Sequence, residues 1–214
     1  MYRFFVSEDQ IDQNRIYIRG QEVNHIKNVL RMKPGEEMCV STGGNLEYRC
    51  AILEYRENEA VAEIRYIQET ELELPSKITL FQGLPKSDKM DLIVQKTVEL
   101  GVCEIVPVAM KRSVVKLDEK KEASRLKRWN AIAKSAAQQA KRMIIPRVTP
   151  VMTFAQALDK AKENEVILMP YELARGIEES KQIIRAIRPG QSVCVFIGPE
   201  GGFAPAEAET AKQA

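Results

Sequence analysis

The feature that most constrains the fold is the segment Val193–Gly202, VCVFIGPEGG, in which an uninterrupted apolar run stops at Gly198. The residues Val193–Ile197 show no polar alternation, which is typical of a strand buried on both faces of a parallel sheet. Open α/β sheets bind their ligands at the carboxyl ends of such strands. We therefore expect Gly198–Gly202 to form an exposed loop at a ligand-binding edge.

The composition of this loop indicates a site built largely from main-chain atoms. Gly201 and Gly202 let the backbone approach a ligand closely and adopt positive φ angles, whereas Pro199 fixes one φ angle. Glu200 adds a carboxylate. An ordinary strand-to-helix turn is the alternative, but it needs neither the acidic residue nor both glycines. The pattern favours a cofactor or nucleotide loop, and it lacks the spacings of dinucleotide sites and P-loops.

From Ser76 onward, strands are predicted to alternate with helices, which is the pattern of a parallel sheet covered by helices. The predicted strands are ITLFQGL, EIVPVAM, VILMP and VCVFIG. The predicted helices are Lys86–Gly101, Ser124–Arg142, Thr153–Lys162, Gly176–Ile187 and one that begins at Pro205. This alternation predicts an α/β domain.

Residues 1–74 are predicted to form an all-β domain instead. Short runs rich in β-branched and aromatic residues are separated by turn signals; they are MYRFFV, RIYIRG, EEMCVSTG, YRCAILEYR and AVAEIRYIQ. One helix, Glu22–Arg31, interrupts them, and five strands at this spacing predict a small barrel. The acidic, proline-ended segment Glu69–Pro75 marks the boundary, so the predicted domains are 1–74 and 75–214.

The composition narrows the class of protein. The chain is 44% hydrophobic and 29% charged, no apolar run approaches the roughly 18 residues of a membrane span, and the N-terminus does not resemble a signal peptide. We therefore expect a soluble, cytoplasmic protein. The four cysteines form no CxxC pair and have no nearby histidine, so they are predicted to be reduced core residues, and no metal site is expected. His25, the only histidine, is predicted to pack or cap.

The net charge of +2 conceals an uneven distribution. Residues 1–75 contain 9 basic and 14 acidic side chains, whereas residues 111–147 contain 12 basic and 3 acidic ones. A solvated helix face usually mixes the two signs, so this surplus favours a polyanionic partner such as nucleic acid over a merely solubilising surface.

Two predicted helices carry side chains suited to RNA. Lys86 and Lys89 follow a strand end at the same edge as the Gly198–Gly202 loop, although a solubilising face is an equal alternative. In Ser124–Arg142, Trp129 and several alanines recur at helical spacing and are predicted to face inward. The opposite side brings together Arg128, Ser135, Gln138, Gln139 and Arg142. Arginine binds phosphates or stacks on bases, and glutamine forms hydrogen bonds with base edges. This set of side chains is therefore suited to binding a nucleotide whose base is splayed out.

With these motifs assembled, the chain resembles the RsmE-type rRNA (uracil-N3)-methyltransferases of the knotted SPOUT superfamily. The segments that carry the resemblance are His25–Arg31, Gly83–Met90, Gln95–Val102, Lys111–Val114, Arg128–Trp129, Ala136–Gln139, Arg142 and Ile197–Phe203. The resemblance implies a PUA-like RNA-binding barrel followed by an α/β trefoil-knot domain. It also implies that S-adenosylmethionine supplies a methyl group to N3 of one uridine in small-subunit (16S) ribosomal RNA.

The resemblance carries roles over to particular residues. The implied cofactor pocket consists of Leu168, Met169, Pro170, Ile197, Gly198, Pro199, Glu200, Gly201 and Gly202. The implied RNA-binding residues are Arg31, Lys86, Lys89, Arg112, Arg128, Gln139 and Arg142. Uridine N3 must lose its proton before it attacks a methyl sulfonium. Glu200 is a candidate general base, and Arg142 is a candidate for stabilising the uracil anion instead.

Two departures from the family are visible. Gln138 stands where the family usually has glutamate, and the chain stops at Ala214, before the family's knot-threading segment; we therefore expect the natural protein to be longer. A homodimer is expected from the superfamily.

A non-catalytic RNA-binding module and a nucleotide-dependent enzyme are the competing hypotheses. Binding of S-adenosylmethionine separates the enzyme from the module, and preference for ATP would favour the third hypothesis.

Overall fold

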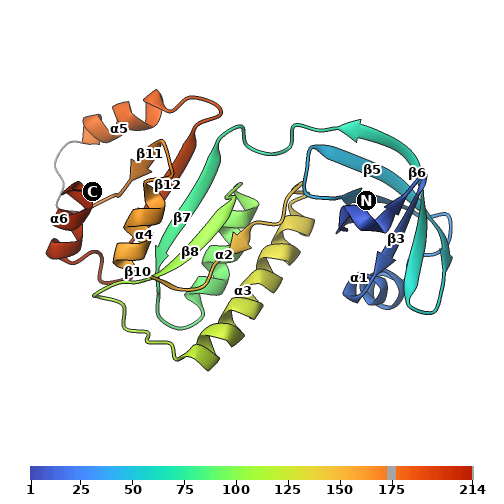
Figure 1. The fold of residues 1–214 in the computed structure, drawn as a ribbon, viewed down its shortest axis with the longest axis horizontal. Coiled ribbons are helices and arrows are strands. Elements are labelled where there is room, and N and C mark those ends of the chain that lie inside the picture. Colours follow the sequence, from blue (N-terminus) through green and yellow to red (C-terminus); the bar gives the residue numbers. More distant parts are fainter. Residues whose placement is uncertain (173–176, 214) are drawn as a thin grey trace. The chain divides into compact units, whose positions relative to one another are not determined.

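The computed structural model describes residues 1–172 and 177–213, and the chain divides into two compact units (Figure 1). The N-terminal unit comprises Met1–Glu73 together with Ala137–Ile145, and the C-terminal unit comprises Leu74–Ala136 and Pro146–Ala214. The nine residues 137–145 thus group with the N-terminal unit, although they lie within the predicted second domain. The reason is a set of long-range hydrogen bonds described below. Gly176, the predicted start of a helix, lies outside the described residues.

The N-terminal unit is a curled six-stranded sheet in the order β1-β4-β5-β6-β3-β2. Its strands are β1 (Arg3–Phe5), β2 (Ile11–Asp12), β3 (Arg15–Arg19), β4 (Glu37–Ser41), β5 (Leu46–Tyr55) and β6 (Glu59–Glu69). The pair β1–β4 is parallel and the other pairs are antiparallel. Register shifts at Arg49/Cys50 and Ile52/Glu54 interrupt the β5–β6 ladder, and bulges of this kind bend a strand. The predicted helix is a turn of α-helix, α1 (Gln21–Asn24), continued by a π-helical turn, His25–Val29.

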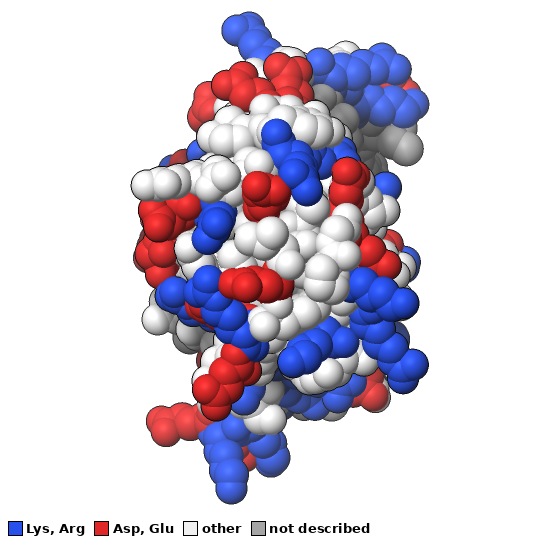
Figure 2. Space-filling view, turned by 90° about the vertical axis from the view of Figure 1, so that its right-hand side faces the viewer, with Lys and Arg blue, Asp and Glu red and all other residues white. Residues whose placement is uncertain are grey.

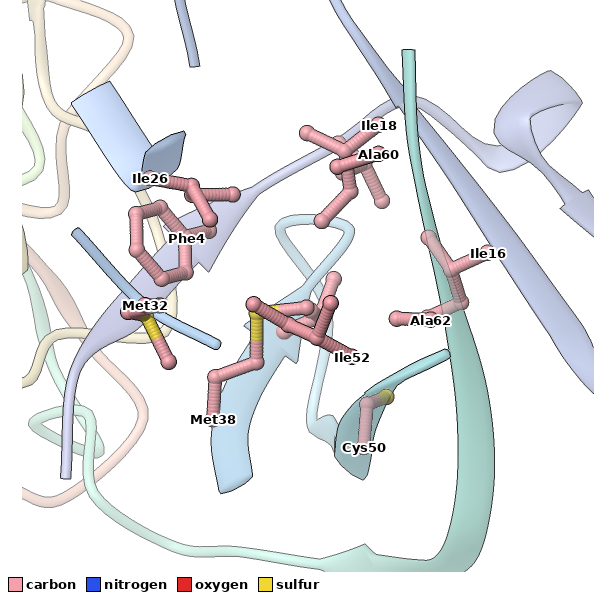
Figure 3. Close-up of a cluster of buried hydrophobic side chains, with 12 residues drawn as sticks. Phe4, Ile16, Ile18, Ile26, Met32, Met38, Cys50, Ile52, Ala60 and Ala62 are labelled. Atoms are coloured by element: carbon pink, nitrogen blue, oxygen red, sulfur yellow. The ribbon is translucent and has the colours of Figure 1, made fainter. Parts of the chain in front are cut away.

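One buried cluster forms the core of this unit (Figure 3). Alternate residues of the strands point inward, as the period of two requires, so Ile16 and Ile18 of β3 face Ala60 and Ala62 of β6. The cluster also contains Phe4, Ile26, Met32, Met38, Cys50 and Ile52. Ile26 is completely buried, so the helical turn closes one end of the core.

The C-terminal unit contains a parallel sheet in the order β10-β8-β7-β12-β11, with β9 pairing with β8. Its strands are β7 (Lys77–Gly83), β8 (Glu104–Ala109), β9 (Arg147–Val148), β10 (Met152–Thr153), β11 (Val166–Leu168) and β12 (Ser192–Ile197). Its helices are α2 (Lys89–Glu99), α3 (Glu119–Gln139), α4 (Phe154–Ala161), α5 (Ile177–Ala186) and α6 (Pro205–Gln213). Because all the strands are parallel, their carboxyl ends meet at one edge.

Both faces of the central strands of this sheet are buried. Phe81 and Phe196 stack with ring centroids 4.5 Å apart on the face that carries α4. Leu80 and Ile105, which alternate with the residues of that face, are also buried. A strand covered on both sides needs apolar residues at consecutive positions, which explains the unbroken run of β12.

The long helix α3 ends earlier than predicted, and this changes the position of Arg142. Helix α3 ends at Gln139, and Lys141 takes a left-handed φ of 57°. The Arg142 N–H then donates to the Ala137 carbonyl at 2.8 Å, which closes the helix end. Arg142 is consequently buried beyond the helix instead of lying on its exposed side with Gln139.

The cysteines are thiols in the part of the chain that is described. All four cysteines are free, and Cys39, Cys50 and Cys194 are buried. Burial raises the pKa of Cys50 to about 12 and that of Cys194 to about 11, so both remain thiols at neutral pH. Within residues 1–172 and 177–213, no three His, Cys, Asp or Glu side chains gather as a metal site would require. Over the same residues, no helix is long and apolar enough to cross a membrane.

Candidate functional site

The loops that follow β7, β8 and β12 meet at the carboxyl edge of the parallel sheet. Gly83, the last residue of β7, lies directly against Pro199 of the loop after β12. A Cβ atom at Gly83 would come within 2.6 Å of Pro199 Cδ, 2.7 Å of Pro199 N and 2.8 Å of Met110 Sδ. Only glycine fits between these three loops, so a residue without a side chain fixes their spacing.

The loop Gly198–Gly202 is a tight turn. The Gly202 N–H donates to the Pro199 carbonyl at 2.8 Å, and Gly202 has a φ of 67°. A Cβ at Gly198 would lie 3.1 Å from the Gly202 backbone. Gly201 does not have the predicted positive φ; it instead packs against Arg112, whose Cβ would lie 3.3 Å from a Cβ at Gly201. The two glycines therefore serve different purposes, one for the turn and one for a close approach.

Glu200 connects this loop to the loop after β7. Its carboxylate accepts the Lys86 N–H at 3.1 and 3.2 Å and pairs with Lys89 Nζ at 3.0 Å. The hydrogen bond from Lys89, helped by backbone N–H groups, lowers the pKa of Glu200 to about 2. A carboxylate with so low a pKa is a poor proton acceptor, which argues against Glu200 as a general base.

Arg112 connects the loop after β8 to the same turn. Its guanidinium donates to the Gly201 carbonyl at 2.7 Å. This bond uses one N–H of a side chain that carries five, so an exposed cation remains beside the turn. Arg112 is a predicted RNA-binding residue, and the structure places it against the predicted cofactor loop.

Glu207 belongs to this site although it is absent from the predicted residues. It is buried at the start of α6, and its two carboxylate oxygens accept the Lys111 N–H at 2.7 Å and the Ala204 N–H at 2.8 Å. A signal for part of this arrangement is present in the sequence. Pro205 at the first helical position with glutamate two residues later is typical of a helix start, where glutamate reaches back to the capping N–H.

The remaining predicted cofactor residues surround the end of β11. Leu168 pairs with Val195 of β12, and Met169 lines an apolar hollow of about 250 Å³ together with Tyr171 and Phe196. Ile197, 39% exposed, ends β12 at the same edge. A second hollow, of about 470 Å³, lies beside Leu84, Met110, Lys111, Ser113 and Lys116. The apolar hollow lies between α4 and α6, because Leu158, Ala161 and Ala208 also line it, whereas the more polar one lies beside the loop after β8.

The predicted RNA-binding residues of the C-terminal unit are exposed lysines and arginines. Lys86 and Lys89 flank Glu200 at the site, as described above, and Arg112 touches Gly201. Arg128 is 62% exposed on α3 and pairs with Asp91 of α2. Three of these four residues thus surround the Gly198–Gly202 loop, and Arg128 belongs to a contact between two helices.

In the N-terminal unit, two predicted RNA-binding residues are exposed and one is buried. Arg31 is exposed, with a φ of 54°, and Gln139 is exposed at the end of α3. Arg142 is only 5% exposed. Its Nε donates to the Glu73 carboxylate at 2.8 and 3.1 Å, and its Nη2 forms a second bond to the same group. The structure therefore removes Arg142 from the exposed surface.

Buried polar groups hold the segment 137–145 against the rest of the N-terminal unit. Burial opposes ionisation of Glu73, but bonds from Arg142 and from the N–H groups of Met143 and Ile144 outweigh it and lower its pKa. Ser41 Oγ donates to the Met143 carbonyl at 2.8 Å. Arg3, buried and paired with Glu47, donates to the Arg142 carbonyl at 3.3 Å. These bonds group the segment with the N-terminal unit.

The charged side chains are mixed on the face shown in Figure 2. There, lysine and arginine side chains alternate with acidic and uncharged ones. On this face the described residues form no extended surface of a single sign. A mixed surface attracts a polyanion less than a uniformly basic one, so this face by itself does not identify a surface for a polyanion.

Family models match both units. A model described as an RNA methyltransferase domain matches residues 72–214. A model described as an RNA methyltransferase PUA domain matches residues 18–65. The first of these covers more than half of the chain and contains the whole Gly198–Gly202 loop.

Relatives of known name match nearly the full chain. Ribosomal RNA small subunit methyltransferase E of Bacillus subtilis is 35% identical and is matched over 98% of this chain and 84% of its own length. The protein of the same name from Mesomycoplasma hyopneumoniae is 32% identical over 100% of this chain and 87% of its own.

Solved structures agree. A crystal structure of ribosomal RNA small subunit methyltransferase E from Neisseria gonorrhoeae, bound to S-adenosyl methionine, has a TM-score of 0.83 and 33% identity, and covers 100% of this chain and 86% of that one. A putative methyltransferase from Legionella pneumophila, in complex with the same cofactor, has a TM-score of 0.84 and 26% identity, over 99% and 85%. The predicted fold class, a small PUA-like barrel followed by an α/β domain of the SPOUT type, is confirmed.

Proposed function

The chain belongs to the RNA methyltransferase family, and we propose that it transfers a methyl group from S-adenosylmethionine to N3 of one uridine in small-subunit (16S) ribosomal RNA. The observation that carries this proposal is the Gly198–Gly202 turn. It lies at the ligand-binding edge of a parallel sheet, is held by two neighbouring loops and is surrounded by exposed cations. The relatives named ribosomal RNA small subunit methyltransferase E match the chain over nearly its whole length.

The residues at this edge suit S-adenosylmethionine. The apolar hollow between α4 and α6, beside Met169 and Tyr171, offers an apolar surface for an adenine ring. The turn Gly198–Gly202 lacks side chains at three of its five positions, so a ligand can approach its main chain closely. We assign the cofactor to Leu168–Pro170 and Ile197–Gly202. When bound, it supplies a methyl group on a positively charged sulfur.

The protein must hold the uridine and favour loss of its N3 proton. Nearby positive charge lowers the pKa of a group that becomes an anion, so the cations at this edge stabilise the deprotonated ring. Lys86, Lys89 and Arg112 surround the turn and supply that charge. Glu200, with a pKa of about 2, holds the loops together in this scheme, and the N3 proton passes to solvent.

RNA is proposed to contact exposed side chains of both units. These are Arg31, Lys86, Lys89, Arg112, Arg128 and Gln139. A direct contact between Arg142 and the uracil ring would require its pair with Glu73 to open. We therefore propose that Arg142 anchors the segment 137–145, which presents Gln139 and Lys141 at the surface.

The proposal also covers the location and the oligomeric state of the protein in the cell. We expect a cytoplasmic homodimer, as the superfamily implies, that acts on ribosomal RNA or on the assembled small subunit. Sedimentation of the purified protein measures the first expectation: a sedimenting mass near twice 24.2 kDa supports a dimer, and a mass near 24.2 kDa contradicts it.

Transfer of labelled methyl from S-adenosylmethionine to small ribosomal subunits that lack the modification tests the activity. Label recovered on N3 of a single uridine after nuclease digestion is the expected result. Label on another atom or nucleotide would contradict the proposed specificity while leaving the enzyme class intact. Tight RNA binding with no methyl transfer and no cofactor binding would favour the non-catalytic module, and preference for ATP would favour a nucleotide-dependent enzyme.

A further inference from the structure

Three consecutive residues of the loop after β8 each contact a different part of the site. Met110 Sδ would lie 2.8 Å from a Cβ at Gly83, so this side chain closes the gap at the end of β7. The Lys111 N–H donates to Glu207, and the Arg112 guanidinium donates to the Gly201 carbonyl. The segment Met110–Arg112 therefore contacts the end of β7, helix α6 and, through Arg112, the proposed cofactor loop.

Glu207 is the buried group that fixes this segment from the other side. It is 8% exposed, between the buried residues Ala204 and Ala208. One oxygen accepts the Lys111 N–H at 2.7 Å and the other accepts the Ala204 N–H at 2.8 Å. A buried carboxylate is costly unless it is hydrogen-bonded, and these two charge-assisted bonds offset that cost.

We propose that Glu207 is a positioning residue for the cofactor site: it holds Lys111 so that Arg112 stays against Gly201 and the Gly198–Gly202 turn keeps its shape. This inference rests on the proposed function, because the turn is the proposed cofactor loop. Glu207 itself acts through backbone N–H groups and needs no contact with the cofactor or RNA.

A simpler role for Glu207 is to start helix α6. Glutamate at the third helical position often accepts the N–H of the residue before the helix, and here that residue is Ala204. The bond to Lys111 is the part that a helix start does not require, because Lys111 lies 96 residues away in the sequence. The two roles therefore predict different results when only one of the two accepting oxygens is removed.

The variant Glu207→Gln makes that distinction. Glutamine serves at this helix position nearly as well as glutamate, but it puts an NH2 group in place of one of the two oxygens, and that group donates and cannot accept an N–H. We expect Glu207→Gln to weaken binding of S-adenosylmethionine about tenfold and to raise the KM for the cofactor without changing the KM for RNA, because a lost charged hydrogen bond has that size. Glu207→Ala should weaken cofactor binding further, and Glu209→Ala, an exposed glutamate of the same helix, should leave it unchanged.

Amide hydrogen exchange gives a readout that is independent of cofactor. Faster exchange at Lys111 and Gly202 in Glu207→Gln, with the later amides of α6 unaffected, is expected. If Glu207→Gln binds cofactor like the parent chain and exchange at Lys111 and Gly202 is unaltered, Glu207 only starts the helix and the proposal is wrong. A second outcome concerns the proposed function. If the parent chain binds no S-adenosylmethionine but exchange at Lys111 and Gly202 still becomes faster in Glu207→Gln, the proposed function and the role of Glu207 at a cofactor site are both wrong. The link between the loop after β8 and the Gly198–Gly202 turn would remain.

Discussion

The loop Gly198–Gly202 and the segment 137–145 are both irregular, and glutamate carboxylates that accept backbone N–H groups hold both of them. They differ in what surrounds those carboxylates. Glu200 is exposed and pairs with a lysine that is 62% exposed. The segment 137–145 depends on Glu73, whose side chain is 19% exposed, and on the pair of Arg3 with Glu47, whose side chains are 4% and 1% exposed.

The difference in exposure of these carboxylates predicts that substitutions in the two regions affect different properties, folding stability in one and activity in the other. A buried ion pair that loses one partner leaves an uncompensated charge, which destabilises a protein by about 3–5 kcal/mol. An exposed pair is screened by water, and its loss changes stability little. Substitutions in the segment 137–145 should therefore reduce folding stability first, whereas substitutions in the Gly198–Gly202 loop should reduce activity first.

The largest effect on stability is expected from Glu47→Gln. Glu47 accepts bonds from Arg3, Arg49 and Gln68, so the variant leaves the buried Arg3 guanidinium without its counter-ion. We expect a loss of about 3–5 kcal/mol in the free energy of unfolding, measured by urea denaturation. Glu63→Gln is the matched control because its pair with Arg65 is more exposed, and its effect should stay within about 1 kcal/mol. Equal losses in the two variants would remove the distinction between buried and exposed pairs.

A smaller, pH-dependent effect is expected from Glu73→Gln. At neutral pH the variant should lose about 2–3 kcal/mol, because it weakens charged hydrogen bonds to Arg142 and to two N–H groups. Folding lowers the pKa of Glu73 from its ordinary value of 4.5, so the stabilisation by Glu73 is fully present above that pH and is lost as the pH falls through the lower folded value.

Urea denaturation of the parent chain and of Glu73→Gln at several pH values checks this sign. The difference between the two proteins should be constant from pH 8 to about pH 5.5 and should shrink below about pH 4.5. A difference that grows toward acidic pH would mean that the pKa of Glu73 is raised on folding, and the account of the segment 137–145 would have to change.

Gly83→Ala should affect stability less than these changes and should affect the site more. The new Cβ would overlap Pro199 at 2.6 Å, and the proline ring and backbone cannot move aside as a flexible side chain would. We expect a loss of about 1–3 kcal/mol from overpacking, together with weaker cofactor binding measured by calorimetry. Gly44→Ala is the control: nothing lies within 4 Å of its Cβ position, and its φ is not positive. Normal cofactor binding by Gly83→Ala would show that the spacing of the loops is not critical.

Most of the fold could be predicted because the strands and helices are long enough to show a period. The alternation in β3 and the unbroken apolar run of β12 identify one half-buried and one fully buried strand. The strands β2, β9 and β10 have two residues each, and two residues carry no period. Their positions depend on neighbouring strands that only the folded chain provides.

The end of α3 and the burial of Arg142 could not be predicted either, because they also depend on features that the local sequence does not show. No glycine or proline marks the stop, because a lysine, Lys141, takes the left-handed conformation that usually belongs to glycine. The burial of Arg142 depends on Glu73, 69 residues earlier in the chain. In the site, the glycines and the proline of the loop predicted a turn. The sequence did not show which glycine has the positive φ and which one packs against a neighbouring side chain, because that depends on contacts with Arg112 and Gly83.

The smallest effect on stability, and the most informative one about chemistry, is expected from Glu200→Gln. The variant keeps an oxygen that accepts the Lys86 N–H and loses only the exposed ion pair with Lys89, so the midpoint of urea unfolding should hardly change. Loss of a general base costs about 10²–10⁴-fold in rate, whereas loosening of a loop contact should cost at most about tenfold in kcat/KM.

The pH dependence of methyl transfer decides between these roles. Because the pKa of Glu200 is about 2, its carboxylate stays ionised between pH 5 and pH 9, so the profile of kcat/KM should keep its shape in Glu200→Gln. Glu99→Gln, which removes another partly exposed carboxylate paired with a lysine, is the matched control and should keep both rate and profile. A rate that falls more than about 100-fold, with the acidic limb of the profile abolished, would identify Glu200 as the base after all and would mean that the exposed carboxylate takes part in the chemistry itself.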